Sequence, residues 1–133
     1  EEFLDQEWAQ GHTLSFKPLK KRRLKVHGHC HQKAFGTVNA SVRMLERIPD
    51  LTVEEIPSGC CGMAGAFGYQ AEHYDVSMAM AELDLLPAVR VTDETTEIVA
   101  SGTSCRAQIR DGTGRTALHP AVLLQRALTE PGD

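Results

Sequence analysis

The segment that decides the fold is Leu51-Thr52-Val53-Glu54-Glu55-Ile56-Pro57-Ser58-Gly59-Cys60-Cys61-Gly62. Its first six residues alternate in part between apolar and polar side chains, which predicts a short β-strand, and Pro57-Ser58-Gly59 breaks that strand. Two adjacent cysteines follow the break directly. The pattern is therefore a strand that ends near a glycine and is followed by a cysteine, and it can be sought before and after this segment.

The same pattern occurs once before this segment and once after it. Residues 24–27 predict a strand that runs into Val26-His27-Gly28-His29-Cys30-His31. Residues 97–101 predict another that runs into Ser101-Gly102-Thr103-Ser104-Cys105. All the cysteines thus lie in three glycine-containing patches, each just past a predicted strand, a context that scattered structural cysteines would not share.

Helical periodicity fills the stretches between the predicted strands. Residues 33–47 predict a helix that Pro49 ends, and residues 72–86 predict a second helix that Pro87 ends. Their expected buried stripes are Ala34, Val38, Val42 and Leu45 in the first, and Val76, Ala79, Met80 and Leu83 in the second. Shorter elements are expected as helices over 1–8, 105–110 and 120–128, a turn over 111–114 and a fourth strand over 116–118.

Alternating strands and helices at this spacing predict an α/β fold, with a small, largely parallel sheet and helices on both faces. In such sheets, ligands bind beyond the carboxyl ends of the strands. Every cysteine lies just past a predicted strand, and His119 follows the short stretch 116–118. The fold is therefore expected to gather these side chains in one crevice.

The cysteines are candidate ligands because thiolates are soft donors that suit zinc and iron–sulfur clusters. Four of them could close a tetrahedral zinc site or hold a cluster. The chain has no Cys-x-x-Cys pair, so the fold would have to assemble the ligands from separate strand–helix units. The proposed ligand set is Cys30, Cys60, Cys61 and Cys105.

Histidines around Cys30 could add to this set. His27, His29 and His31 alternate around Cys30, and one of them could bind a metal or hydrogen-bond a sulfur. On an extended segment, His29 and His31 would share one side and Cys30 the other. The alternative is that they satisfy backbone carbonyls at the strand end. His119 is a further candidate from its own loop. An apolar wall over the site is expected from Met63, Phe67 and Tyr69, unless these pack in the core.

Composition narrows the function classes. With 133 residues, a net charge of −4 and 5% aromatic residues, the chain fits one domain and gives no support for nucleic-acid binding. The basic run at 17–23 is interpreted as a solvated lead-in to the first strand rather than a localisation signal. No apolar run reaches the roughly 20 residues that cross a membrane.

Cysteine usage leaves four alternatives to a cluster. A structural zinc domain would use the same four ligands, and a thiol switch would join Cys60 and Cys61 in a reversible disulfide. A secreted two-disulfide domain fits poorly, because such domains are usually smaller. A Cys–His nucleophile at Cys30 would not need the other cysteines.

Three stretches together resemble the cysteine-rich CCG domain that occurs in heterodisulfide reductase and in the iron–sulfur subunit of glycolate oxidase. They are His27-Gly28-His29-Cys30-His31-Gln32-Lys33-Ala34, Ser58-Gly59-Cys60-Cys61-Gly62-Met63-Ala64-Gly65-Ala66-Phe67-Gly68-Tyr69 and Gly102-Thr103-Ser104-Cys105. The middle stretch is most similar to the C-terminal region of fused FAD-linked oxidases. The resemblance covers about residues 24–128, so we expect residues 1–23 to be a lead-in and 24–130 a CCG-type domain.

The resemblance implies an iron–sulfur electron-transfer domain of a 4Fe-4S type, or a zinc domain, within an oxidoreductase that acts on a 2-hydroxy acid. FAD would lie in another part of the protein, and the partners would be flavin and ferredoxin-like domains. The family pattern ends in Cys-x-x-Cys, whereas Gly102 replaces the first cysteine here. One family ligand is therefore missing, which leaves the cluster type open.

The chain begins with Glu1 rather than Met, and we expect a C-terminal fragment of a larger protein. Its expected location is the cytoplasm, either free or peripherally at the inner membrane.

Overall fold

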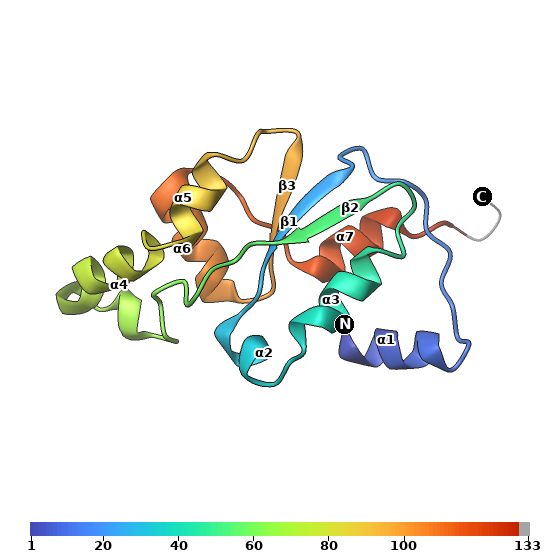
Figure 1. Ribbon diagram of the computed structural model, residues 1–133, viewed down its shortest axis with the longest axis horizontal. Coiled ribbons are helices and arrows are strands. Elements are labelled where there is room, and N and C mark those ends of the chain that lie inside the picture. The colour runs from blue at the N-terminus through green and yellow to red at the C-terminus, as the bar shows by residue number, and fades with distance from the viewer. Residues whose placement is uncertain (131–133) are drawn as a thin grey trace.

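Three parallel strands form the centre of the computed structural model, which describes residues 1–130 (Figure 1). β1 (Arg23–His27) lies between β2 (Thr52–Glu55) and β3 (Thr96–Ala100). Arg23 pairs with both Thr52 and Thr96, so the three strands start level with one another. Their carboxyl ends therefore share one edge of the sheet, and the predicted α/β fold with a small parallel sheet is confirmed.

Helices cover both faces of the sheet. Leu24, Val26 and Val99 point to the face packed by α3 (Val38–Leu45) and α7 (Pro120–Ala127). Ile98 and Ala100 point to the opposite face, which α5 (Leu85–Arg90) and α6 (Thr103–Thr113) cover. In Figure 1, α5 and α6 lie on one side of the strands, and α3 and α7 lie on the other. This two-sided core confirms the expected placement of the helices.

The helix predicted over 33–47 is two helices. α2 (Cys30–Ala34) starts earlier, and Gly36, with φ of 68°, turns the chain before α3 begins. Glycine adopts such a left-handed conformation without strain. Ala34 no longer shares a face with α3, whose buried residues are Val38, Ala40, Ser41, Met44 and Leu45.

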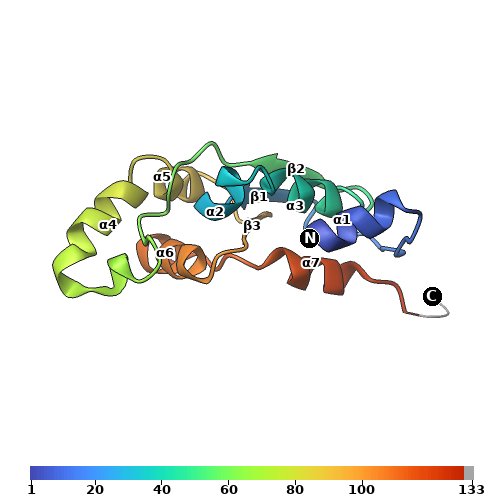
Figure 2. The ribbon, with the colours of Figure 1, turned by 90° about the horizontal axis from the view of Figure 1, so that it is seen from below.

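The helix predicted over 72–86 is also divided. Short 3₁₀ turns at Phe67–Tyr69 and Ala71–His73 lead into α4 (Tyr74–Ala81), and Pro87 lies in the first turns of α5 instead of ending a helix. The predicted buried stripe is wrong, because Val76 is 54% exposed and Leu83 is 76% exposed. α4 buries Ser77 and Ala81 instead, and it projects at one end of the molecule (Figure 2).

The C-terminal elements follow the expected order with different lengths. α6 (Thr103–Thr113) continues through residues 111–113, where a turn is predicted, and Gly114, whose φ is 73°, caps its end. The expected fourth strand is reduced to one parallel bridge between Leu118 and Val99. α7 begins at Pro120, as predicted.

The segment before β1 packs on the rest of the chain. α1 (Glu2–Ala9) and the stretch after it place Leu4, Trp8, Phe16 and Leu19 against the α3/α7 core. Trp8 stacks on Phe16, with ring centroids 5.9 Å apart. Among residues 1–130, no helix has both the length and the apolar character needed to cross a bilayer.

Candidate metal centre

The cysteine-bearing patches meet at the carboxyl edge of the sheet. A pocket of about 440 Å³ opens there, lined by His29, Cys30, His31, Ala34, Cys60, Cys61, Ala64, Gly65 and Ser104. These residues come from all three segments that follow the strands. Because β2 and β3 flank β1, the chain passes from one side of β1 to the other, and crevices at such a switch are where α/β sheets bind ligands.

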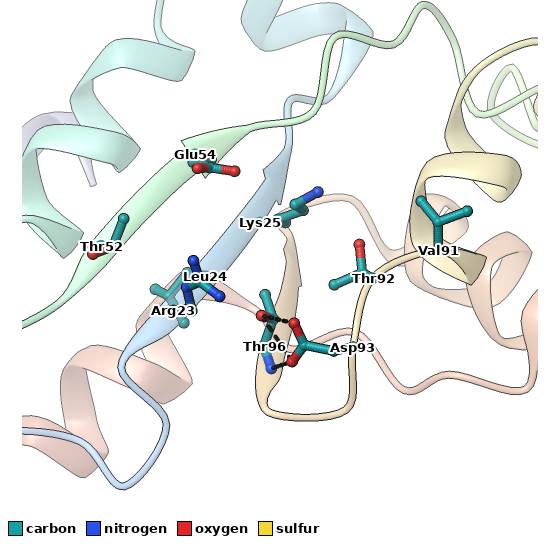
Figure 3. Close-up of a pocket in the computed structure, with 9 residues that line it drawn as sticks. All are labelled: Arg23, Leu24, Lys25, Thr52, Glu54, Val91, Thr92, Asp93 and Thr96. Carbon is teal, nitrogen blue, oxygen red and sulfur yellow. Dashed lines mark hydrogen bonds between the residues drawn. The ribbon is translucent and has the colours of Figure 1, made fainter.

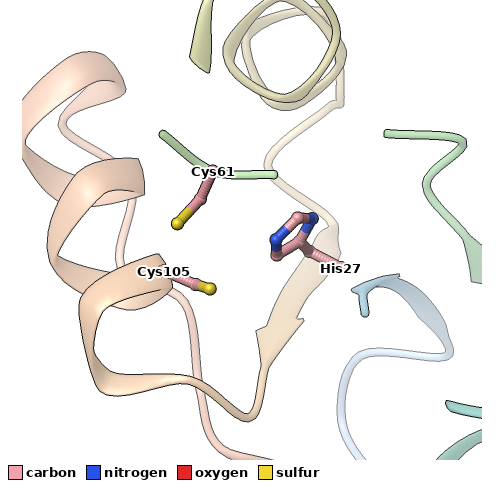
Figure 4. Close-up of side chains that lie close together, drawn as sticks. All are labelled: His27, Cys61 and Cys105. Carbon is pink, nitrogen blue, oxygen red and sulfur yellow. The ribbon is translucent and has the colours of Figure 1, made fainter. Parts of the chain in front are cut away.

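A tight group of potential ligands lies beside this pocket. One ligand atom each from His27, Cys61 and Cys105 lies within 4.8 Å of the other two (Figure 4). The three residues are 1%, 4% and 1% exposed. His27 ends β1, Cys61 lies in the loop after β2, and Cys105 lies in the first turn of α6 after β3.

Cys30 lies on the outer side of the same crevice. It is exposed and starts α2, and the side chain of His29 caps that helix by accepting the His31 amide. The segment around Cys30 is therefore helical, and the expectation that it is extended, with His29 and His31 on one side, is wrong. Both histidines nevertheless line the pocket with Cys30.

The loop that carries Cys60 and Cys61 is fixed from two directions. The Gly62 amide donates to the Cys60 sulfur at 3.3 Å. From α6, the buried Gln108 amide donates to the Cys61 carbonyl at 3.0 Å and to the Ser77 hydroxyl at 2.9 Å. Since Cys105 also lies on α6, this helix positions two of the three cysteine-bearing segments relative to each other.

Electrostatics make Cys61 the thiolate of the buried pair. A hydrogen bond from the Cys105 thiol is the main cause that lowers the pKa of Cys61, with smaller contributions from His27 and the Met63 amide against the opposing effect of burial. The same hydrogen bond, together with burial, raises the pKa of Cys105. Negative charge on Cys61 acts in that direction too, and the sulfurs of Cys30 and Cys60 lie near enough to Cys105 to add to it.

The other candidates lie elsewhere. His119 caps α7, with Nδ1 accepting the Ala121 amide at 3.1 Å, and it does not line the cysteine pocket. Of the expected apolar wall, Met63 is buried in the α5/α6 core, Phe67 stacks on His73 and Tyr69 is 61% exposed. These three residues do not line the pocket, and Met63 follows the alternative of core packing.

Gln108 is missed as a site residue from sequence, and His27 is named only as one of three histidines around Cys30 and is not among the proposed ligands. Strand alternation could have indicated His27, because it shares the α5/α6 face of β1 with Lys25 and ends the strand. For Gln108 the sequence carries no signal, since a glutamine on a helix is ordinarily solvated.

A second pocket lies at the opposite edge of the sheet. Its lining includes the first residue of each strand, Arg23, Thr52 and Thr96 (Figure 3). The Asp93 carboxylate accepts hydrogen bonds from the amide and hydroxyl of Thr96 there. This lining holds neither cysteine nor histidine, so of these two pockets the one at the carboxyl edge contains the soft donors.

Comparison with known proteins places the chain beside segments of dehydrogenases. It is 34% identical over 123 residues to one subunit of the anaerobic glycerol-3-phosphate dehydrogenase of Escherichia coli (strain K12), covering 90% of this chain and 29% of that protein. It is 31% identical over 128 residues to D-2-hydroxyglutarate dehydrogenase of Pseudomonas putida, covering 93% of this chain and 12% of that protein.

The chain thus spans less than a third of the length of these curated relatives. No family model matches it, and no solved structure does so either. The similarity to both relatives extends over at least nine-tenths of this chain, which is the length of one domain. The chain is therefore related to a domain-sized part of larger oxidoreductases.

Proposed function

We propose that this chain is a metal-binding electron-transfer module of a larger oxidoreductase, with Cys30, Cys60, Cys61 and Cys105 holding an iron–sulfur cluster. One observation carries the proposal. Three segments that are far apart in sequence meet at the carboxyl edge of the sheet, where Cys30, Cys60 and Cys61 line one pocket and Cys105 lies in the buried group with Cys61 beside it.

The donor set fits such a group. Cysteine thiolates are the usual ligands of iron–sulfur clusters, and a bound cluster would supply one-electron transfer. Cys61 is already favoured as a thiolate, and Cys61 and Cys105 are screened from water by the α5/α6 core. Cys30 lies at the exposed side of the crevice, where electrons could pass over a short distance between the buried sulfurs and a docked partner.

The relatives and the family resemblance support a proposal for the other domains of the whole protein. A flavin domain elsewhere would oxidise a 2-hydroxy acid and pass electrons through ferredoxin-like centres to the CCG-type domain at 24–130. Flavin and ferredoxin-like domains are therefore the proposed partners, and the cytoplasm, free or at the inner membrane, is the proposed location. The similarity to glycerol-3-phosphate and 2-hydroxyglutarate dehydrogenases supports small hydroxylated acids or phosphates as substrates of the whole protein.

A structural zinc site is the second candidate. The group formed by His27, Cys61 and Cys105, with a fourth ligand from Cys30 or Cys60, has the ligand types of a tetrahedral Cys₃His site. Such a site would hold the three segments together without transferring electrons. Colour separates the two functions, because zinc is spectroscopically silent and iron–sulfur clusters absorb visible light.

The test is metal and sulfide analysis with a visible spectrum, on the chain purified anaerobically and reconstituted with iron and sulfide. Iron with acid-labile sulfide and visible absorption supports the electron-transfer module, whereas stoichiometric zinc without colour supports the structural site. The Cys61→Ser variant should lose the metal, while Ser104→Ala, which alters the same pocket without removing a sulfur, should retain it. Full metal retention by Cys61→Ser would refute a site shared by the four cysteines.

A further inference from the structure

We propose that Nε2 of His27 is a direct ligand of the metal or cluster, in addition to the cysteines. This inference rests on the proposed function of the site and deepens it, because it supplies a nitrogen donor where Gly102 provides no side chain.

The first support is the surroundings of the His27 ring. His27 is 1% exposed, and Nε2 makes no hydrogen bond of ordinary geometry among residues 1–130, although the ring lies close enough to Cys61 to lower the pKa of that thiol. A buried polar nitrogen without a partner costs free energy, so it calls for a specific explanation such as a role in binding a metal. One nitrogen of this ring lies within 4.8 Å of both the Cys61 and the Cys105 sulfur. Because Nδ1 already contacts the Ser58 hydroxyl, we assign this role to Nε2.

The hydrogen bond at Nδ1 sets the tautomer that coordination requires. Nδ1 lies 2.7 Å from the Ser58 hydroxyl, which itself reaches the Ile56 carbonyl at 3.5 Å. When the Ser58 hydroxyl donates its proton to the Ile56 carbonyl, its oxygen accepts a hydrogen bond from Nδ1–H of His27. The neutral ring then carries its free lone pair on Nε2. Metal-binding histidines characteristically use their second nitrogen in this way. Lys33 donates to the Ser58 carbonyl and holds the same loop.

The same reasoning excludes His29 and His119. In His29, Nδ1 accepts the His31 amide at 3.2 Å, and in His119 it accepts the Ala121 amide at 3.1 Å. A neutral ring that accepts at Nδ1 carries its proton on Nε2, which can then donate a hydrogen bond to a sulfur but cannot bind a metal. Of these three rings, only His27 presents a free lone pair toward the sulfurs.

Gly102 explains why the nitrogen comes from β1. A Cβ at position 102 would lie 2.5 Å from the His29 ring and 2.9 Å from the Cys105 sulfur. The His29 ring therefore fills the space that a side chain at 102 would need. A side chain at position 102, just after β3, would have no room to supply a ligand. His27, at the end of the adjacent strand β1, can supply one instead.

The spacing of the group is compatible with a shared metal. Ligand atoms bound at about 2.0–2.3 Å in a tetrahedral site lie about 3.6 Å apart. The present atoms lie within 4.8 Å of one another, so a closure of about 1 Å would bring them to bonding distance. Gln108 on α6 already links the segment that carries Cys61 to the helix that carries Cys105.

The experiment compares wild type with His27→Gln, His27→Cys, His29→Gln and His12→Gln, each reconstituted with iron and sulfide. Pulsed EPR on reduced samples, with natural and ¹⁵N-histidine-labelled protein, detects a nitrogen bound to a paramagnetic centre. Titration of each metal-free chain with Co²⁺ gives affinity, and the intensity of the sulfur-to-cobalt bands counts thiolates. His12 pairs with Glu7 on the surface, so His12→Gln is the control for losing a histidine.

We expect a histidine nitrogen signal in wild type that His27→Gln and His27→Cys both remove and His12→Gln leaves. His27→Gln should weaken Co²⁺ binding by about 100-fold. Removing a residue that only hydrogen-bonds to a ligand costs about 10- to 100-fold in metal affinity, and loss of a ligand itself should reach at least the upper end of that range. His27→Cys should bind Co²⁺ with a stronger sulfur band, which shows that this variant is folded and that the position faces the metal.

Three outcomes overturn the inference. If metal binds but the nitrogen signal and Co²⁺ affinity survive in His27→Gln, His27 is not a ligand although the proposed function stands. If His29→Gln alone removes the signal, His29 is the ligand instead. If wild type binds neither iron nor cobalt, the proposed function fails together with this inference.

Discussion

Gly62 and Gly65 share a backbone conformation but differ in their surroundings. Their φ values are 89° and 69°, so any side chain at either position is strained by about 1 kcal/mol. A Cβ on Gly62 would overlap the Ser77 carbonyl oxygen, whereas a Cβ on Gly65 meets nothing within 4 Å. Gly62→Ala should therefore lower the free energy of unfolding by about 1–3 kcal/mol more than Gly65→Ala does.

Urea unfolding of the metal-free chain, followed by circular dichroism, measures this difference. Gly65→Ala is the matched control, because it introduces the same side chain at a positive φ in the same loop. Equal losses in the two variants would mean that the loop shifts away from α4 without cost, and that Ser77 does not fix the Cys60–Cys61 loop.

The residues of the site divide into those that sequence could predict and those that it could not. The position of each cysteine after a strand and a glycine is visible in the sequence, and these segments do converge. Sequence does not reveal which of the histidines around Cys30 faces the sulfurs with a free ring nitrogen. The choice depends on contacts at Nδ1, where the Ser58 hydroxyl lies beside His27 and the His31 amide donates to His29. Gln108 depends on α6 crossing the Cys61 loop, a contact 47 residues apart in sequence.

At the scale of elements, sequence predicts the order of strands and helices better than the limits of the helices. The three strands are correctly predicted because hydrophobic runs bounded by glycine or proline are a local signal. The split at Gly36 and the exposed face of α4 are missed, since helical periodicity alone does not reveal which face meets a neighbour. Val76 and Leu83 keep the spacing of a buried stripe, yet α4 projects from the body.

The contact between α1 and α3 gives a pH-dependent prediction. The Arg43 guanidinium donates to the Asp5 carboxylate at 2.6 Å, and this hydrogen bond holds the pKa of Asp5 below its usual value. A lowered folded-state pKa stabilises the fold above about pH 4, the unfolded pKa, and that contribution is lost as pH falls through the folded pKa. Arg43→Met should therefore lower the urea midpoint at pH 7 but lose this effect in acid.

Urea midpoints measured across the pH range test this dependence. Arg110→Met is the control, because Arg110 pairs only loosely, at 3.5 Å, with its neighbour Asp111 on α6, where both side chains are exposed. A difference between Arg43→Met and wild type that stays constant from neutral to strongly acidic pH would show that the charge pair does not hold α1 in place.

Across the whole molecule, the sheet separates two cores with different relations to the site. The α5/α6 core contains Cys61 and Cys105, whereas the α3/α7 core contains neither. A defect in the first core can therefore reach the sulfurs by direct packing, and a defect in the second can reach them only through the sheet. Binding and stability should respond differently to similar changes on the two faces.

Ile109 and Ile48 provide a matched pair for this prediction. They are 0% and 1% exposed, in the α5/α6 core and the α3/α7 core respectively. Each Ile→Val change removes one buried methyl group and should cost about 0.5–1.5 kcal/mol of stability. Ile109→Val should also weaken Co²⁺ binding about two- to tenfold, which is the lower part of the coupling of about 0.5–3 kcal/mol between residues packed in one cluster. Distant residues, in contrast, add independently.

Cobalt titration and urea unfolding of both variants decide whether the site belongs to one face. If Ile48→Val weakens cobalt binding as much as Ile109→Val, the metal senses overall stability rather than local packing. If only Ile109→Val does so while both lose similar stability, the sulfurs are held by the α5/α6 core. The three-stranded sheet would then separate the α5/α6 core, which positions the metal ligands, from the α3/α7 core, which contributes to the stability of the fold alone.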